Sequence, residues 1–191
     1  MIKLIVGLGN PGRQYELTRH NAGFLFLDVL ADEYANGWQH DSKFNGMIAQ
    51  AKIAHHSVVL LKPDTFMNRS GLAVGKVARY YKLQPEEILI VHDELDFEAG
   101  IVKLKKDGGH AGHNGLRDII AHLNSNQFYR LRLGIGRPPA GKIVADYVLS
   151  APSKPEFEQL LGAFQLCKTH IAKMVSGDIA AVMNTLNTAK K

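Results

Sequence analysis

The sequence predicts an α/β domain, in which strands and helices alternate along the chain. Short apolar runs that suit buried strands alternate with amphipathic stretches that suit helices. Of the 191 residues, 46% are apolar and 21% are charged, which is the composition of a soluble domain with enough apolar material for one core. We therefore expect a single domain over residues 1–191.

The amino-terminal part of the chain predicts a strand followed by a helix. Residues 2–8 form a mostly apolar run that suits a buried strand, and residues 22–36 have the pattern of an amphipathic helix. Asn21 stands directly before that helix. It is a candidate N-cap because its side chain can accept hydrogen bonds from the free amides of the first turn.

Further along, apolar runs separated by turn residues predict the remaining elements. They are a hairpin of residues 47–54 and 57–62 around His55 and His56, a helix from Ser70 or Gly71 to about Lys82, a buried strand over 88–92, strands over 101–105 and 129–136, and a helix over 116–123. A glycine-rich segment, residues 108–115, leads into this last helix. From about Lys154 we expect helices to the end of the chain, with a break at Gly177.

The sequence also argues against a membrane or secreted protein. It has no run of about 18 apolar residues, and the first residues, MIKLIVGLGN, reach glycine too early for a signal peptide. The single cysteine, Cys167, cannot form an internal disulfide or a cysteine-based zinc site, and its apolar neighbours predict a packed thiol. We therefore expect a cytoplasmic protein with no membrane partner.

The net charge of +5 is concentrated in one part of the chain. Eight basic and two acidic residues lie between Lys103 and Lys142, whereas the rest of the chain has 15 basic and 16 acidic residues. Clustered cations lower the electrostatic energy of phosphates, so this asymmetry indicates a polyanionic partner such as nucleic acid. A solvated charged face is the ordinary alternative.

Three glycines within residues 7–12 match the dinucleotide-binding pattern G-x-G-x-x-G. That pattern requires a helix that starts in the glycine turn, but residues 13–16 offer no apolar helical face, and Asp28 and Asp32 lie inside the predicted helix rather than at a strand end. We interpret the glycines as a sharp turn that leaves Asn10 at the carboxyl end of a buried strand, where α/β domains place their sites. A simple turn asparagine is the alternative.

His20 and Asp93 are the candidate catalytic pair. His20 immediately precedes the predicted helix of residues 22–36, and the positive end of that helix should keep its imidazole neutral and available as a base near pH 7. Asp93 follows the buried strand of residues 88–92, and its carboxylate could hold one imidazole nitrogen protonated and free the other. The alternatives are a surface turn histidine and a capping or ion-paired aspartate.

Two other kinds of chemistry receive weaker support. His110 and His113, with residues 92–94, could suggest a metal site, but HAGH lacks helical ligand spacing and the chain has no HExxH motif. Cys167 lies in an apolar helix, and Ser70 lacks the G-x-S-x-G nucleophile elbow. We therefore expect no metal, and hydrolysis by an activated water is the simplest chemistry.

Five motifs together resemble the bacterial type of peptidyl-tRNA hydrolase, in order and over residues 2 to about 150. They are GLGNPG (7–12), Tyr15 with TRHN (18–21), the segment from Lys62-Pro63 through TFMNRSG (65–71), HDELD (92–96) and GGHAGHNGLRDI (108–119). The resemblance implies a single-domain mixed β-sheet surrounded by helices, no cofactor and a monomer. It implies an esterase that releases peptide from peptidyl-tRNA lost by ribosomes and so recycles the tRNA.

The resemblance also implies roles for individual residues. His20 would be the general base, with Asp93 orienting it, and Asn10 would position the substrate carbonyl or water. The remaining roles are divided between the two ends of the substrate: Asn68 and Asn114 would bind the peptide main chain, Tyr15 and Phe66 would shape the same cleft, and Lys105 and Arg132 would clamp the 5′-terminal phosphate of the tRNA.

The period-two pattern of the two basic strands supports the phosphate clamp independently. Apolar residues occupy one face of each strand, so Lys103, Lys105, Arg130 and Arg132 should fall on the opposite, solvated faces. If the strands are neighbours, four cations line one surface and can contact phosphates without reading bases. A non-catalytic RNA-binding domain that uses this face is the alternative function.

Overall fold

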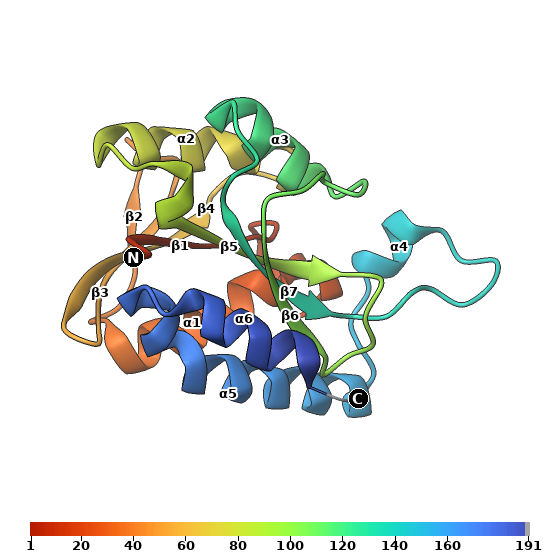
Figure 1. The fold of residues 1–191 in the computed structure, drawn as a ribbon. Coiled ribbons are helices and arrows are strands. Elements are labelled where there is room, and N and C mark those ends of the chain that lie inside the picture. Colours follow the sequence, from red (N-terminus) through yellow and green to blue (C-terminus); the bar gives the residue numbers. More distant parts are fainter. Residues whose placement is uncertain (190–191) are drawn as a thin grey trace.

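The computed structural model describes residues 1–189 and contains a seven-stranded mixed sheet between two layers of helices (Figure 1). The strand order is β2-β3-β4-β1-β5-β7-β6. The strands are β1 (Leu4–Gly7), β2 (Gln39–Asp41), β3 (Gly46–Ile53), β4 (His56–Pro63), β5 (Ile88–Glu94), β6 (Val102–Lys106) and β7 (Tyr129–Gly134). The expected mixed sheet is confirmed. Residues 190 and 191 of the expected domain lie outside the described part.

The four central strands run parallel and the outer ones antiparallel. β1 pairs with β4 and β5, and β5 pairs with β7, all in parallel. β2, β3 and β6 pair antiparallel with their neighbours. Because the carboxyl ends of β1 and β5 meet at one edge of the sheet, the residues that follow these strands lie close together.

Each face of the sheet is covered by helices. Residues alternate between the two faces along each strand, and the central strands are apolar at successive positions, so both faces must be buried. The helices are α1 (Ala22–Tyr34), α2 (Ser70–Tyr80), α3 (Asn114–Leu123), α4 (Val144–Val148), α5 (Lys154–Ser176) and α6 (Ile179–Thr188). α1, α5 and α6 pack on the face that includes Ile5, whereas α2 and α3 pack on the face that includes Leu4 and Val6 (Figure 1). In residues 1–189, no helix combines the length and the apolar character needed to cross a bilayer.

Two short elements have no clear sequence signal. β2 has three residues and α4 has five, so neither is long enough to show a period. The glycines of residues 7–12 do not open an α-helix: a short 3-10 helix, Arg13–Tyr15, follows them instead. The expected helical region does begin at Lys154, and Gly177 breaks it in a left-handed conformation.

The expected capping role of the Asn21 side chain is wrong. Asn21 occupies the N-cap position of α1, but its side chain makes no capping hydrogen bond. Its Oδ1 accepts from the backbone N–H of Asn10 at 2.8 Å, and its Nδ2 donates to the Asn10 carbonyl at 2.9 Å. The side chain therefore fixes the turn after β1, since both of its polar groups are already used there.

Candidate active site

A cavity of about 680 Å³ lies where β1 and β5 end. One wall is formed by α4 and another by most of the glycine loop, which we define as residues 107–113 between β6 and α3. The predicted site residues in its lining are Asn10, His20, Phe66, Asn68, Asp93, Lys105, Asn114 and Arg132. The fold thus brings together residues from distant parts of the chain.

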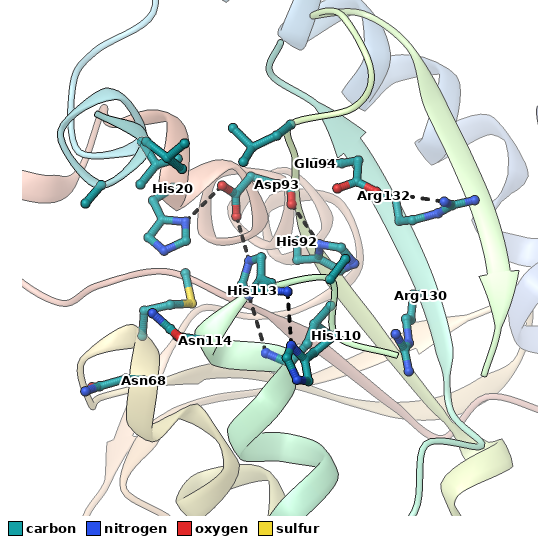
Figure 2. A pocket seen from close by; sticks show the side chains of 18 of the residues that line it. His20, Asn68, His92, Asp93, Glu94, His110, His113, Asn114, Arg130 and Arg132 are labelled. Atoms are coloured by element: carbon teal, nitrogen blue, oxygen red, sulfur yellow. Dashed lines mark hydrogen bonds and ion pairs between the residues drawn. The ribbon is translucent and has the colours of Figure 1, made fainter. Parts of the chain in front are cut away.

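Asp93 lies between two histidines in the lining of this cavity (Figure 2). Its Oδ2 is 2.8 Å from Nδ1 of His20, and its Oδ1 is 2.9 Å from Nε2 of His113. Only 3% of Asp93 is exposed. Each carboxylate oxygen therefore has its own imidazole partner, and the structure brings His20 and Asp93 together as the sequence led us to expect.

The hydrogen bonds of His113 define its tautomer. His113 is the N-cap of α3, where its Nδ1 accepts from the backbone N–H of Leu116 at 3.3 Å. Because Nδ1 is an acceptor, the proton of the neutral ring is on Nε2, from which it is donated to Asp93. His20 bonds to Asp93 through Nδ1 instead, so its Nε2 lies on the side of the ring away from Asp93 (Figure 2).

The expectation that the start of α1 lowers the pKa of His20 is wrong. Burial lowers the pKa of His20, but the charge of Asp93 and its hydrogen bond raise it, and the net pKa is above the ordinary value of 6.5. A buried carboxylate at hydrogen-bond distance outweighs the partial charge of a helix end. His20 is therefore a stronger base than an isolated histidine.

The charges around Asp93 are arranged to keep it ionised. Burial alone would raise the pKa of Asp93, but His20 and His113 hold it well below its usual range. Burial and the nearby His113 lower the pKa of the neighbouring His92 to about 3, so this third ring stays neutral. Asp93 therefore carries the negative charge at this end of the cavity.

Within the described chain, the side chains that could hold a metal ion are His20, Asp93 and His113, whose ligand atoms lie within 4.8 Å of one another. This set differs from the one considered from the sequence, because His110 and Glu94 are not part of it. The same nitrogen and oxygen atoms form the hydrogen bonds to Asp93. We interpret the cluster as a proton network rather than as a metal site.

Asn10 is not a simple turn residue. It is 7% exposed, and its Oδ1 accepts from the backbone N–H of Met67 at 2.7 Å. This bond fixes the orientation of the amide, because the oxygen must face Met67. Nδ2 remains as the donor side of a group that lines the same cavity as His20.

The other predicted peptide-side residues surround the same opening. Asn68 and Asn114 are exposed and line the cavity, at a 3-10 helix (Met67–Arg69) and at the first position of α3. Phe66 is also in the lining and is 58% exposed. Tyr15 is not in the lining, but its ring meets that of Phe66 edge to face, with centroids 6.3 Å apart.

Cations gather on the side of the cavity away from His20 (Figure 2). β6 and β7 are neighbours, with Lys103 opposite Arg132 and Lys105 opposite Arg130, so all four side chains share one face. Burial and the charges of Arg132 and Arg130 lower the pKa of Lys105. Such mutual repulsion between cations favours an anion.

One of the four cations is not on a solvated face as expected. Arg130 is only 1% exposed, because the glycine loop covers it: its guanidinium donates to the carbonyls of Gly108 and Gly109. Arg132 is also largely enclosed, with 17% of its side chain exposed, and its guanidinium lies 3.9 Å from the Glu94 carboxylate. The period-two pattern gave the correct face, but it could not show that a loop covers part of it.

Sequence reasoning missed two contributions to the cavity. His113 was considered only as a weak metal ligand, yet it is the second partner of Asp93. No sequence signal pointed to this role, because the helix was expected from residue 116 and histidine is not among the residues that commonly cap a helix. The apolar wall formed by Val144, Val148 and Leu149 had no signal, because α4 is too short to be recognised.

Comparisons with known proteins agree with this geometry. The family model described as "Peptidyl-tRNA hydrolase" matches residues 4–191. A peptidyl-tRNA hydrolase of Methylococcus capsulatus is 52% identical over 187 residues, which cover 98% of this chain and 100% of that protein. One of Bordetella parapertussis is 51% identical and covers 98% of this chain and 89% of its own. The crystal structure of peptidyl-tRNA hydrolase from Acinetobacter baumannii superimposes with a TM-score of 0.94 at 46% identity, over 99% and 96% of the two chains.

Proposed function

The chain belongs to the peptidyl-tRNA hydrolase family, and we propose that it cleaves the ester between a peptide and the terminal ribose of a tRNA by a water that His20 activates. The observation that carries this proposal is the contact of 2.8 Å between His20 Nδ1 and Asp93. With its proton donated from Nδ1 to the carboxylate, the neutral ring keeps a free electron pair on Nε2.

The reaction needs one proton transfer in each direction. His20 Nε2 takes a proton from water while the water oxygen attacks the ester carbonyl carbon. Asp93 remains ionised and stabilises the imidazolium that forms. When the tetrahedral intermediate collapses, the bond between the carbonyl carbon and the ribose oxygen breaks, and the imidazolium gives its proton to that oxygen.

Neutral amides are suited to the peptide side of this reaction. The Nδ2 group of Asn10 is a donor held in place by the bond from Met67, and we assign to it the stabilisation of the developing oxyanion or the orientation of the water. Asn68 and Asn114 offer both donors and acceptors for a peptide main chain, and Phe66 with Tyr15 forms the apolar border.

The cationic side of the cavity is suited to the tRNA. Lys105 and Arg132 are assigned to the 5′-terminal phosphate, because both line the cavity and share one face of neighbouring strands. Contacts with phosphate carry no sequence information, which fits an enzyme that must accept many tRNAs. We further infer that the enzyme acts in the cytoplasm and that it is a monomer. Light scattering of the purified protein, which measures its molar mass, tests the monomer.

A blocked aminoacyl-tRNA tests the proposed function directly. Cleavage of its ester should be rapid with the native protein, and His20→Ala should lower the rate at least about a hundredfold while tRNA binding survives. Binding of the substrate without cleavage by the native protein would instead favour an RNA-binding domain. Near-normal cleavage by His20→Ala would remove His20 from the role of base.

A further inference from the structure

Arg130 is a buried cation that the proposed chemistry does not use. It lies in β7 and has the largest side chain among those that are less than 2% exposed. In the described part of the chain, no carboxylate lies within ion-pair distance of its guanidinium. The charge of Asp107 favours the guanidinium from beyond that distance, but burying a cation without a close ion pair is costly, so the groups that surround Arg130 indicate its role.

Those groups are mainly carbonyl oxygens of the glycine loop. Nη1 donates to the Gly109 carbonyl at 2.5 Å and Nη2 to the Gly108 carbonyl at 2.6 Å, with a longer bond of 3.5 Å from Nη2 to the Asn126 carbonyl. The guanidinium also lies over the ring of Phe128, 4.6 Å from its centroid. Its two terminal nitrogens thus hold two consecutive carbonyls of one loop.

The glycine loop needs such an anchor. Gly108, Ala111 and Gly112 all have positive φ angles, and three of its seven residues are glycine, so the loop has many alternative conformations. Within residues 1–189, two other side chains from outside the loop bond to it: Asp93 holds His113 at the end of the loop, and Nδ2 of Asn126 donates to the Gly108 carbonyl at 3.2 Å. Among the described residues, Arg130 and Asn126 are therefore the side chains outside the loop that hold its glycine carbonyls.

The loop ends at His113 and leads directly into Asn114. His113 reaches Asp93 and also caps α3, so its ring must be placed accurately to make both bonds. A displacement of about 1 Å at such a position can cost about a hundredfold in rate. The segment that Arg130 holds is therefore the one that positions the second partner of Asp93.

We propose that Arg130 is a positioning residue for the hydrolysis: its guanidinium fixes the carbonyls of Gly108 and Gly109 and thereby holds His113 against Asp93. This inference rests on the proposed function of the same site. It separates Arg130 from Arg132 on the same strand, since Arg130 serves the loop and Arg132 the phosphate. The planar guanidinium, with its two terminal nitrogens as a fork, is essential to this role. The side chain of lysine ends in one nitrogen, which cannot reproduce the two separate bonds to the Gly108 and Gly109 carbonyls.

Arg130→Lys tests the proposal, because it keeps the charge and removes the fork. We expect kcat to fall about 10- to 100-fold, with KM and the rate ratio between 5′-phosphorylated and 5′-hydroxyl substrates nearly unchanged. Nitrogen NMR should show that His113 loses its single tautomer. Arg79→Lys, at an exposed position in α2, is the matched control and should behave as the native protein.

Three results would overturn the proposal. They are a native kcat, a native His113 spectrum, or a loss of the 5′-phosphate effect, which would place Arg130 at the phosphate. If Arg130→Lys does not fold, Asn126→Ala decides, because it removes the other side-chain bond to the loop and should give the same spectrum change with a smaller loss of kcat. Since the spectrum needs no substrate, it remains informative even if the native protein fails to cleave the ester.

Discussion

Nδ1 of His20 lies 2.8 Å from Oδ2 of Asp93, although 73 positions separate the two residues in the chain. The parallel pairing of β1 and β5 brings them together, because His20 belongs to the segment after one strand and Asp93 to the end of the other. The contact has two consequences for a base: it fixes which nitrogen is free, and it raises the pKa of the ring.

The first prediction concerns pH. A base works only when it is unprotonated, so kcat/KM should fall as the pH decreases through the pKa of His20, with an inflection above 6.5. Asp93→Asn removes the causes that raise this pKa and leaves the burial that lowers it. The inflection should therefore move to lower pH while the plateau rate falls about 10²- to 10⁴-fold. A pH–rate profile of both proteins measures this.

Another aspartate provides the matched control for that profile. His40 and Asp64 also form a pair at 2.8 Å, but at an exposed position outside the cavity lining. Asp64→Asn should leave the rate and the inflection unchanged. An inflection in Asp93→Asn at or above that of the native protein would contradict the role that we assign to the carboxylate.

The sequence predicted more about the site than about how it is held together. Asn10, His20 and Asp93 could be placed because parallel strands end at a common edge, which is a rule of topology. The direction of the His20 pKa could not be predicted, because it depends on a distance between two side chains. The burial of Arg130 was missed for a similar reason: a glycine loop has no periodic pattern, so its path over β7 is set by tertiary contacts.

The second prediction concerns the tRNA side. Arg132→Ala should raise KM and reduce the slope of log KM against log salt concentration by about one unit. The variant makes one phosphate contact fewer than the native protein, so its binding to tRNA releases fewer counterions. Arg79, an exposed arginine of α2 outside both the cavity lining and the basic segment of residues 103–142, is the control, and Arg79→Ala should keep the native slope. If both variants have the native slope, Arg132 does not contact a phosphate.

The third prediction concerns metal ions. Dialysis against a strong chelator should leave the rate of ester cleavage unchanged, because the clustered atoms of His20, Asp93 and His113 are engaged in hydrogen bonds with one another. The rate before and after dialysis, with metal content measured in parallel, provides the test. A loss of activity that Zn²⁺ restores would show that the cluster is a metal site.

The fourth prediction concerns Gly23, where α1 crosses the sheet. A Cβ atom at this position would lie 2.6 Å from the backbone nitrogen of Leu8 and in closer conflict with the carbonyl oxygen of Val91. These two atoms form the hydrogen bond that joins the end of β1 to β5. Gly23→Ala should therefore push α1 away from the sheet and lower the free energy of unfolding by about 1–3 kcal/mol.

Urea unfolding and kinetics together test this packing. Gly162→Ala, in α5, is the control, because a Cβ there meets no atom within 4 Å and alanine favours a helix by about 1 kcal/mol, so its stability should be equal or higher. α1 starts two residues after His20, so Gly23→Ala should also lower kcat while Gly162→Ala should not. Native stability and kcat in Gly23→Ala would mean that the close contact of α1 does not set the position of His20.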